Sequence, residues 1–530
     1  MRHPRGVIAV AVAAALALSG CGGGGGGSSS SGDSGSTTLS WAIASAPRAI
    51  DMYGDFSANA NVVGSLVNEP LVTLKNLKLE PSLAASWKAT SPTTYVYTLR
   101  EGVKFSDGNP VTAEDVAYSF NRHLTEDSTS QSVSHLKTLK EASVTGGNEV
   151  TVKLVKPDAT WVYDPMFAPV VEKAVVEKAG DQYGAPGGTV VGTGPYKVES
   201  FSASDGIVLK RNENYWGPKP PFEEVHFTYV ADPNSLSLAL RSGDVDGSFG
   251  LPLSKVAQFD KLPGVTLTEG DALATASLMM DLDTPPFDDI HVRKAFAYAW
   301  DAPTFAKTVL GGHATPANAI ASPGFWANLA DQAKVDEIYK SIPSYSFDMQ
   351  AAARELAQSK TPQGFSTSIS YPDSRPELGQ ALQVLAEKLK QLKITLTVKE
   401  IPYSQWVTLI SSHKDLKIQI AQWNPDYPDP SDLILSQYPS SHAVKNQYNL
   451  SNYRDDTVDK LIDKELASTD DAERIETMTS ILKKVAEDVP NVNLYWPKTI
   501  MAVREPYKYQ NYNGMYASEL WVYNLAKAAS

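Results

Sequence analysis

The chain has 530 residues but a single cysteine, Cys21, so no disulfide can form within it. Enzyme signatures are also missing: the sequence contains no Gly-x-Ser-x-Gly elbow, no Walker loop and no His-Glu-x-x-His. Its eight histidines are scattered singly, without the spacing of a closed metal site. These absences argue against catalysis and predict no cofactor and no metal.

Long hydrophobic runs are equally scarce. The apolar run 7–18 follows Arg2, His3 and Arg5 and is shorter than the roughly 20 residues that span a bilayer. Its end, Leu18-Ser19-Gly20-Cys21, resembles the bacterial lipobox, in which the cysteine is lipidated and becomes the first mature residue. We therefore expect a lipoprotein signal peptide at 1–21, then a flexible Gly/Ser linker at 22–37. A conventional signal followed by a stray cysteine is the alternative.

Positive charge is in deficit as well. The formal net charge is −13, whereas nucleic-acid binding needs basic patches, so we expect no nucleic-acid partner. A hydrophobic fraction of 42% and 34 prolines are typical of a loop-rich globular protein. The length predicts two or three domains.

The clearest pattern of secondary structure lies in the second half of the chain. Alternating strand and helix patterns there predict βαβαβ, the signature of a parallel sheet covered by helices. The five segments are 365–371, 376–392, 394–400, 404–412 and 417–422. Residues 492–496 predict a strand that could return to the first half of the chain. In that first half, Thr112 and Asp115 have the spacing of a capping box at a helix start.

A proline-rich loop, Trp423-Asn424-Pro425-Asp426-Tyr427-Pro428-Asp429-Pro430, follows the last of these strands. Each proline fixes φ and lacks an N–H donor, so the loop is stiff. Ligands collect at the carboxyl ends of strands in open α/β sheets, which makes Asp426 a candidate ligand contact with Trp423 as an apolar wall. The alternative is a surface turn in which Asp426 and Asp429 cap backbone groups. Any single tryptophan ring is by default a core residue.

The chain resembles the extracytoplasmic solute-binding proteins of peptide-type ABC importers, the oligopeptide/dipeptide/nickel-binding family 5. The resemblance covers about residues 39 to 520 in order. The matching stretches are 69–72 (EPLV), 81–87 (PSLAASW), 99–108 (LREGVKFSDG), 110–116 (PVTAEDV), 192–196 (GTGPY), 211–216 (RNENYW), 286–289 (PFDD), 292–295 (VRKA) and 426–430 (DYPDP).

The resemblance implies an α/β fold with two lobes, periplasmic-binding-protein-like (class II, clamshell), with an extra subdomain in the first lobe. It places lobe I at 38–75, 188–272 and 498–530, the extra subdomain at 76–187, and lobe II at 273–497. The solute is expected between the lobes.

The resemblance also implies site residues. Trp423, Asp426 and Tyr427 match a Trp-x-x-Asp-Tyr stretch whose acid pairs with the peptide α-ammonium in peptide binders. Trp406 matches a pocket-lining tryptophan, although its spacing to Asp426 differs by a couple of residues. Glu69 falls where lobe I approaches the amino end of the ligand. An Arg-Pro pair binds the carboxylate in dipeptide binders, but Arg375-Pro376 is not in register with it.

The expected role is that of a lipid-anchored receptor on the outer face of the bacterial cytoplasmic membrane. It would close on a small peptide or related solute, as a monomer, and deliver it to ABC permease and ATPase subunits. One alternative is a non-peptide solute, such as an oligosaccharide, an opine, haem or a nickel complex. The other is a chaperone-like or sensory lipoprotein.

Overall fold

The structure is a computed structural model that describes residues 38–527. The predicted signal peptide at 1–21, with Cys21, and the predicted linker at 22–37 lie outside the described residues. Over 38–527, no helix is both long and apolar enough to cross a membrane. The helices are α1 (Ala58–Gly64), α2 (Ala113–Asn121), α3 (Lys173–Ala179), α4 (Pro233–Ser242), α5 (Val256–Phe259), α6 (Ile290–Ala299), α7 (Ala302–Thr308), α8 (Gln332–Ser341), α9 (Met349–Gln358), α10 (Pro376–Lys390), α11 (Tyr403–Ser412), α12 (Ser431–Gln437), α13 (Asp456–Ala467) and α14 (Asp471–Asp488).

The strands form one large sheet and several small ones. They are β1 (Thr38–Ile43), β2 (Val72–Lys75), β3 (Lys78–Pro81), β4 (Ala84–Ser91), β5 (Thr94–Leu99), β6 (Leu139–Gly146), β7 (Glu149–Leu154), β8 (Tyr196–Ser202), β9 (Gly206–Arg211), β10 (Glu224–Tyr229), β11 (Gly247–Ser248), β12 (Val265–Asp271), β13 (Thr275–Met280), β14 (Ala314–Pro316), β15 (Ser366–Pro372), β16 (Thr395–Ile401), β17 (Ile418–Trp423), β18 (Asn491–Arg504), β19 (Tyr507–Tyr509) and β20 (Leu525–Lys527).

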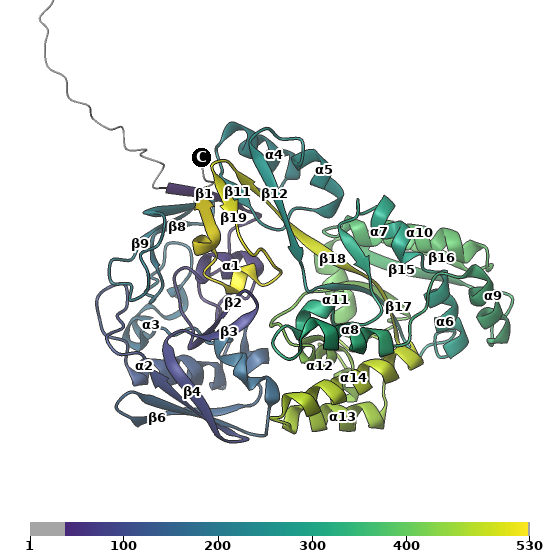
Figure 1. Cartoon of the computed structure of the whole chain (residues 1–530), viewed down its shortest axis with the longest axis horizontal. Helices are drawn as coiled ribbons and strands as arrows, with labels where there is room; N and C mark the ends of the chain where they lie inside the picture. Colours follow the sequence, from purple (N-terminus) through teal and green to yellow (C-terminus); the bar gives the residue numbers. More distant parts are fainter. Residues whose placement is uncertain (1–37, 528–530) are drawn as a thin grey trace, which may run out of the picture. The chain divides into compact units, whose positions relative to one another are not determined.

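Strand β18 joins the two lobes. Its first half pairs with β13 of lobe II, and β13 pairs on its other side with β17. Its second half pairs with β12 and β11 of lobe I, and β11 leads on to β1, β10, β9 and β8. Figure 1 shows this long yellow strand running from one group of strands to the other. The predicted strand at 492–496 is therefore confirmed, and it continues well beyond the predicted end.

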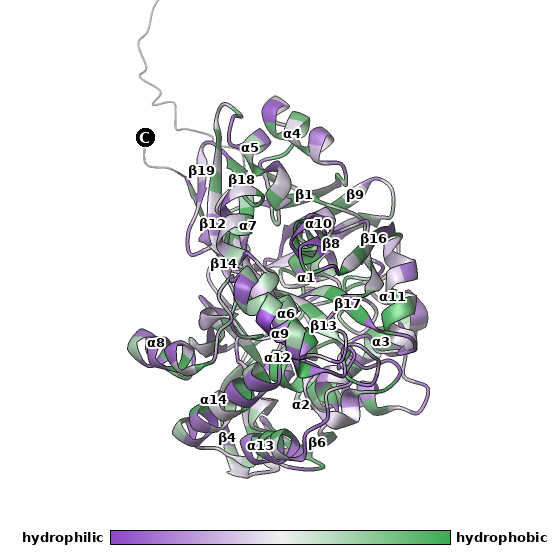
Figure 2. Cartoon of the chain, turned by 90° about the vertical axis from the view of Figure 1, so that its right-hand side faces the viewer, coloured by the Kyte–Doolittle hydropathy of each residue, from purple (hydrophilic) through white to green (hydrophobic). Residues whose placement is uncertain are grey.

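The predicted βαβαβ unit is correct in its elements but only in part in its pairing. Strands β15 and β16 are parallel neighbours, as predicted. Strand β17 does not extend their sheet, because it pairs antiparallel with β13 instead. All six residues of β13 are buried, and Figure 2 colours the β13–β17 region mostly hydrophobic. An apolar run predicts a buried strand, but it does not identify the neighbour that buries it.

The extra subdomain contains an antiparallel sheet in the order β4-β5-β7-β6. Helix α2 packs on β6 and begins at the predicted capping box, which is confirmed. The Thr112 hydroxyl accepts from the backbone N–H of Asp115 at 3.1 Å, and the Asp115 carboxylate accepts from the backbone N–H of Thr112 at 3.1 Å. One apolar core continues from this subdomain to helices α12, α13 and α14 of lobe II.

The Gly192-Thr193-Gly194 turn links the extra subdomain to the segment that follows α1. The N–H of Gly194 donates to the carbonyl of Val67 at 2.9 Å, and the Gly192 carbonyl accepts from Ser106 at 2.9 Å. A Cβ on Gly192 would overlap the carbonyl oxygen of Val67. The turn thus needs glycine for close backbone approach.

Replacing Gly192 by Ala should therefore destabilise the protein by about 1–3 kcal/mol, the usual cost of overpacking. Urea unfolding followed by circular dichroism would measure it. Gly147→Ala is the matched control, because a Cβ there meets nothing within 4 Å. Equal stability of the two variants would contradict the close-approach argument.

Candidate functional site

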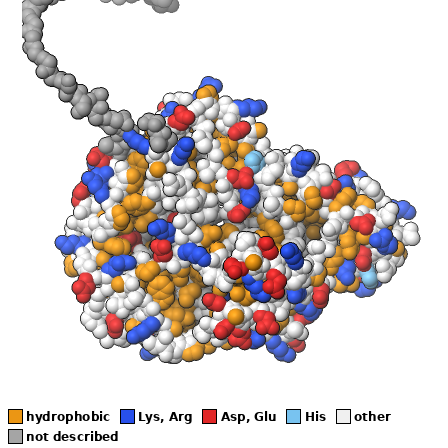
Figure 3. Space-filling view, in the orientation of Figure 1, with side chains coloured by type: hydrophobic (Ala, Val, Ile, Leu, Met, Phe, Trp, Pro, Cys, Tyr) orange, Lys and Arg blue, Asp and Glu red, His pale blue; other side chains and the backbone are white. Residues whose placement is uncertain are grey.

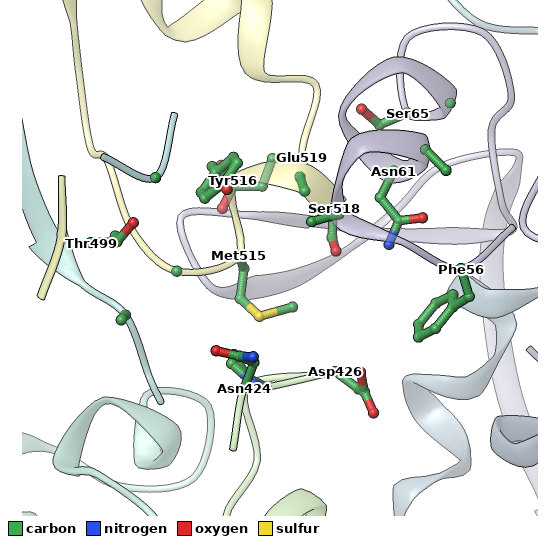
Figure 4. Close-up of a pocket in the computed structure, with 18 of the residues that line it drawn as sticks. Phe56, Asn61, Ser65, Asn424, Asp426, Thr499, Met515, Tyr516, Ser518 and Glu519 are labelled. Carbon is green, nitrogen blue, oxygen red and sulfur yellow. The ribbon is translucent and has the colours of Figure 1, made fainter. Parts of the chain in front are cut away.

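A cavity of about 860 Å³ opens between lobe I and lobe II. Its walls come from segments that are far apart in the sequence. They are α1 and the residues around it, the loops 250–255, 373–377 and 422–426, the middle of β18, and the C-terminal stretch 514–520. Figure 4 shows Asp426 and Asn424 on one side and Met515, Ser518 and Asn61 on the other. The volume lies in the range of small-ligand sites.

Asp426 projects into this cavity from the proline-rich loop after β17. The carboxylate of Asp432 accepts from the backbone N–H of Asp426 at 2.7 Å, which fixes the loop. The Asp426 side chain is 39% exposed, and its Oδ2 lies 3.5 Å from Nε2 of His135 in the extra subdomain. Dense surrounding protein raises the pKa of Asp426 to about 7. Burial lowers the pKa of His135 to about 4, so this imidazole is neutral near pH 7.

Glu69 reaches the cavity from lobe I and is almost fully buried. Its carboxylate accepts from the indole N–H of Trp216 at 2.9 Å and from the hydroxyl of Tyr215 at 3.4 Å. Burial raises the pKa of Glu69 to about 7, and the Trp216 hydrogen bond opposes that rise. The positive charge of Arg100 also opposes the rise in the pKa of Glu69, but among the described residues no Lys, Arg or His forms an ion pair with Glu69 within 4 Å. The carboxylate is therefore held ready for a positive or hydrogen-bond-donating group.

Arg375 brings positive charge to the same cavity. It stands just before α10, its side chain is 41% exposed, and its nearest carboxylate is Glu377 at 3.7 Å. Lys498, another lining cation, is already paired with Asp271. The cavity thus offers acids on both lobes and a loosely paired guanidinium.

The predicted site residues divide into two sets. Asp426, Glu69 and Arg375 line the cavity. Trp406, Trp423 and Tyr427 are not among the described residues that line it, so their contact with a ligand stays a prediction. Trp406 belongs to a small core with Met279, and Tyr427 stacks on Tyr163 with ring centroids 5.0 Å apart.

The sequence did not predict several residues that line the cavity, nor His135, which lies beside Asp426. The lining residues among them are Asn61 of α1, Ser65 at the C-cap of α1, Thr499 of β18, and residues 515–519. The return of β18 to lobe I was the only available signal, because these segments meet only after the whole chain has folded. Over residues 38–527, no group of three or more His, Cys, Asp or Glu side chains is placed to hold a metal ion.

These features define a two-lobed solute-binding protein with its cleft between the lobes. The sequence model of the bacterial extracellular solute-binding proteins, family 5 Middle, matches residues 78–445. The chain belongs to this family, as the resemblance predicts. The family is one of solute-binding proteins and not of enzymes.

Two curated relatives come from Escherichia coli K12. The protein named "Probable D,D-dipeptide-binding periplasmic protein DdpA" is 26% identical over 444 residues, covering 82% of this chain and 83% of the relative. The glutathione-binding protein GsiB is 24% identical over 458 residues, covering 84% and 86%.

Solved structures show the same fold. The periplasmic binding protein DppA from Helicobacter pylori, in complex with the peptide STSA, is 20% identical with a TM-score of 0.77 and coverage of 93% and 98%. NikZ from Campylobacter jejuni, in complex with Ni(L-His), is 20% identical with a TM-score of 0.76 and coverage of 93% and 100%. At such identities the likeness concerns the fold alone, which therefore does not select one solute.

Proposed function

We propose that this protein captures short peptides, or related solutes with a free amino group, and delivers them to the permease of an ABC importer. In this proposal Cys21 carries a lipid anchor at the outer face of the cytoplasmic membrane, residues 22–37 form a tether, and the protein acts as a monomer. It performs no catalysis. Import energy comes from the ATPase partner.

The observation that carries the proposal is the arrangement of charge in the cavity. Asp426 of lobe II and Glu69 of lobe I both line it, and neither has a full cationic partner among the described residues. A ligand ammonium group would supply that charge, since a charge-assisted hydrogen bond is stronger than a neutral one. Arg375 could receive a ligand carboxylate.

The capture mechanism follows from the two-lobed fold. A ligand that contacts both lobes favours the closed form over the open one, because it binds the closed form more tightly. Asp426 and Glu69 stand on opposite lobes, so one amino group between them would link ligand binding to closure.

Mass spectrometry of solutes that copurify with the protein tests the proposal directly. Thermal-shift measurements with di- to pentapeptides, each with a free and an acetylated N-terminus, test the ammonium requirement. We expect stabilisation by the free peptides and much less by the acetylated ones. Equal stabilisation by both forms would contradict the role of Asp426 and favour a non-peptide solute such as an opine, a sugar, haem or a nickel complex.

Binding of peptides with a free amino end should depend on pH. Asp426 and Glu69 each have a pKa raised to about 7, so both become protonated as the pH falls below that value. Affinity for these peptides should therefore rise with pH. Below pH 7, each of the two carboxyl groups should contribute at most about a tenfold increase per pH unit. Isothermal titration calorimetry at pH 5.5, 6.5 and 7.5 would measure this change, and N-acetyl peptides are the control.

The same shifts have the opposite effect on the stability of the unliganded protein. A carboxyl group whose folded-state pKa lies above its unfolded value of about 4 binds its proton more tightly when folded. The stability that this tighter proton binding adds to the folded protein is fully present below about pH 4 and is lost as the pH rises through 7. Ligand binding and unliganded stability should thus respond to pH in opposite directions, which separates the two effects.

A further inference from the structure

Lobe II contains a second cavity, of about 380 Å³, that shares no lining residue with the cleft between the lobes. It lies among the end of α6, the start of α7, the loop 343–347, α14 and the start of β18. Asn491, at the first position of β18, lines it. Asn493 of β18 also lines it, whereas Pro497, four residues further along the strand, lines the cleft, so the two sites approach to roughly 13 Å at about 3.3 Å per residue.

The side chain of Asn491 is an unsatisfied polar group in this cavity. The residue is only 8% exposed, and neither its Nδ2 nor its Oδ1 has a hydrogen-bond partner among the described residues. Burial raises the pKa of the nearby Tyr438 phenol, and Asn491 partly opposes that rise. The phenol nevertheless does not reach hydrogen-bonding geometry with the Asn491 amide. A buried amide left without partners costs stability, so a donor and acceptor from outside the chain are expected there.

Three other polar side chains of the cavity wall already have partners within the chain. The indole N–H of Trp300 donates to the Leu494 carbonyl at 2.8 Å, and the Tyr345 hydroxyl donates to the Ala486 carbonyl at 3.1 Å. Asp301, the only charged side chain among the described lining residues, faces the ammonium of Lys388 at 3.8 Å. The remaining wall is largely apolar and includes Leu482, Val485, Val489 and Val492. The cavity therefore suits a neutral, mainly apolar molecule.

We propose that this lobe II cavity is a second binding site, for a small neutral cyclic amide anchored by the carboxamide of Asn491. A carboxamide presents a donor and an acceptor side by side. Its complement is a cis secondary amide, such as a lactam, whose N–H and C=O lie on the same edge and pair with it through two hydrogen bonds. The aliphatic ring of the ligand then packs on Trp300 and the valines. This site is independent of the solute proposed for the cleft.

Titration of the whole protein with δ-valerolactam, followed by ligand-observed NMR, tests the proposal. We expect saturable binding that weakens at least tenfold in Asn491→Leu, which removes both hydrogen-bonding atoms. Ser346→Ala, which removes a different polar group from the same wall, should bind as the unaltered protein does. Asp426→Asn, in the cleft, should also leave lactam binding unchanged.

A second measurement needs no variant at all. N-Methyl-δ-valerolactam keeps the ring and the carbonyl but lacks the N–H, so it should bind the unaltered protein at least tenfold more weakly. Equal binding of the two lactams would overturn the proposal. Unchanged lactam affinity in Asn491→Leu would overturn it too, and so would a lactam seen only in soaked crystals without saturable binding in solution.

Discussion

Replacing Asp426 by Asn should lower the affinity for a peptide with a free N-terminus by about 10- to 150-fold. This range corresponds to the roughly 1.5–3 kcal/mol of a hydrogen bond to a charged group. Asparagine keeps the size and the backbone contacts of the loop but cannot neutralise an ammonium. Isothermal titration calorimetry at pH 7.5, where Asp426 is mostly ionised, would measure the loss.

Asp373→Asn is the matched control, because Asp373 is another acid of the cavity wall and its carboxylate accepts from the backbone N–H of Tyr403 at 3.1 Å. Asp373→Asn should change the affinity by no more than about twofold, because it removes only a long-range attraction to the ligand that salt screens. The N-acetyl peptide should bind Asp426→Asn and the unaltered protein alike. A loss of equal size in both variants would show that general charge, and not contact with Asp426, attracts the ligand.

Replacing Arg474 by Met should destabilise the fold by about 3–5 kcal/mol, because it leaves two buried acids without their cation. The Arg474 guanidinium lies 3.0 Å from Oδ2 of Asp429 and 2.7 Å from Oε1 of Glu465. All three side chains are at most 5% exposed. Urea unfolding monitored by circular dichroism would give the free energy of unfolding.

The matched control is Lys464→Met, which breaks a surface pair with Glu473 at 3.1 Å. Both partners are about half exposed, so the loss should stay below about 1 kcal/mol. If Arg474→Met cost no more than this control, the buried cluster would not depend on its cation. Peptide affinity should not change in either variant that remains folded.

Asp426 and Asp429 show why the sequence predicts the fold better than the site. They lie three residues apart in one proline-rich loop, and local pattern treats them alike. In the structure Asp426 faces the cavity, whereas Asp429 is fully buried and paired with Arg474 on α14. The distinction depends on a helix that follows some forty residues later, which no local spacing reveals.

The same reasoning applies to the aromatic residues and the strands. Periodicity located β15, α10, β16, α11 and β17 to within a few residues, because burial of one face leaves a repeat in the sequence. The pairing of β17 with β13 and the cavity contacts of residues 515–519 leave no such repeat. A tryptophan can face a core or a cleft with the same local sequence, so the sequence alone does not say which of the two Trp406 faces.

The continuity of β18 has a practical consequence for protein engineering. A cut between residues 497 and 498 would sever a ladder that pairs with β13 on one side and with β12 on the other. Each fragment would then expose the unpaired edge of a β-sheet, a known template for aggregation. Neither fragment, 1–497 or 498–530, should therefore be expressible as an autonomous unit. Reporter domains are better inserted into exposed turns such as the one at Gly147.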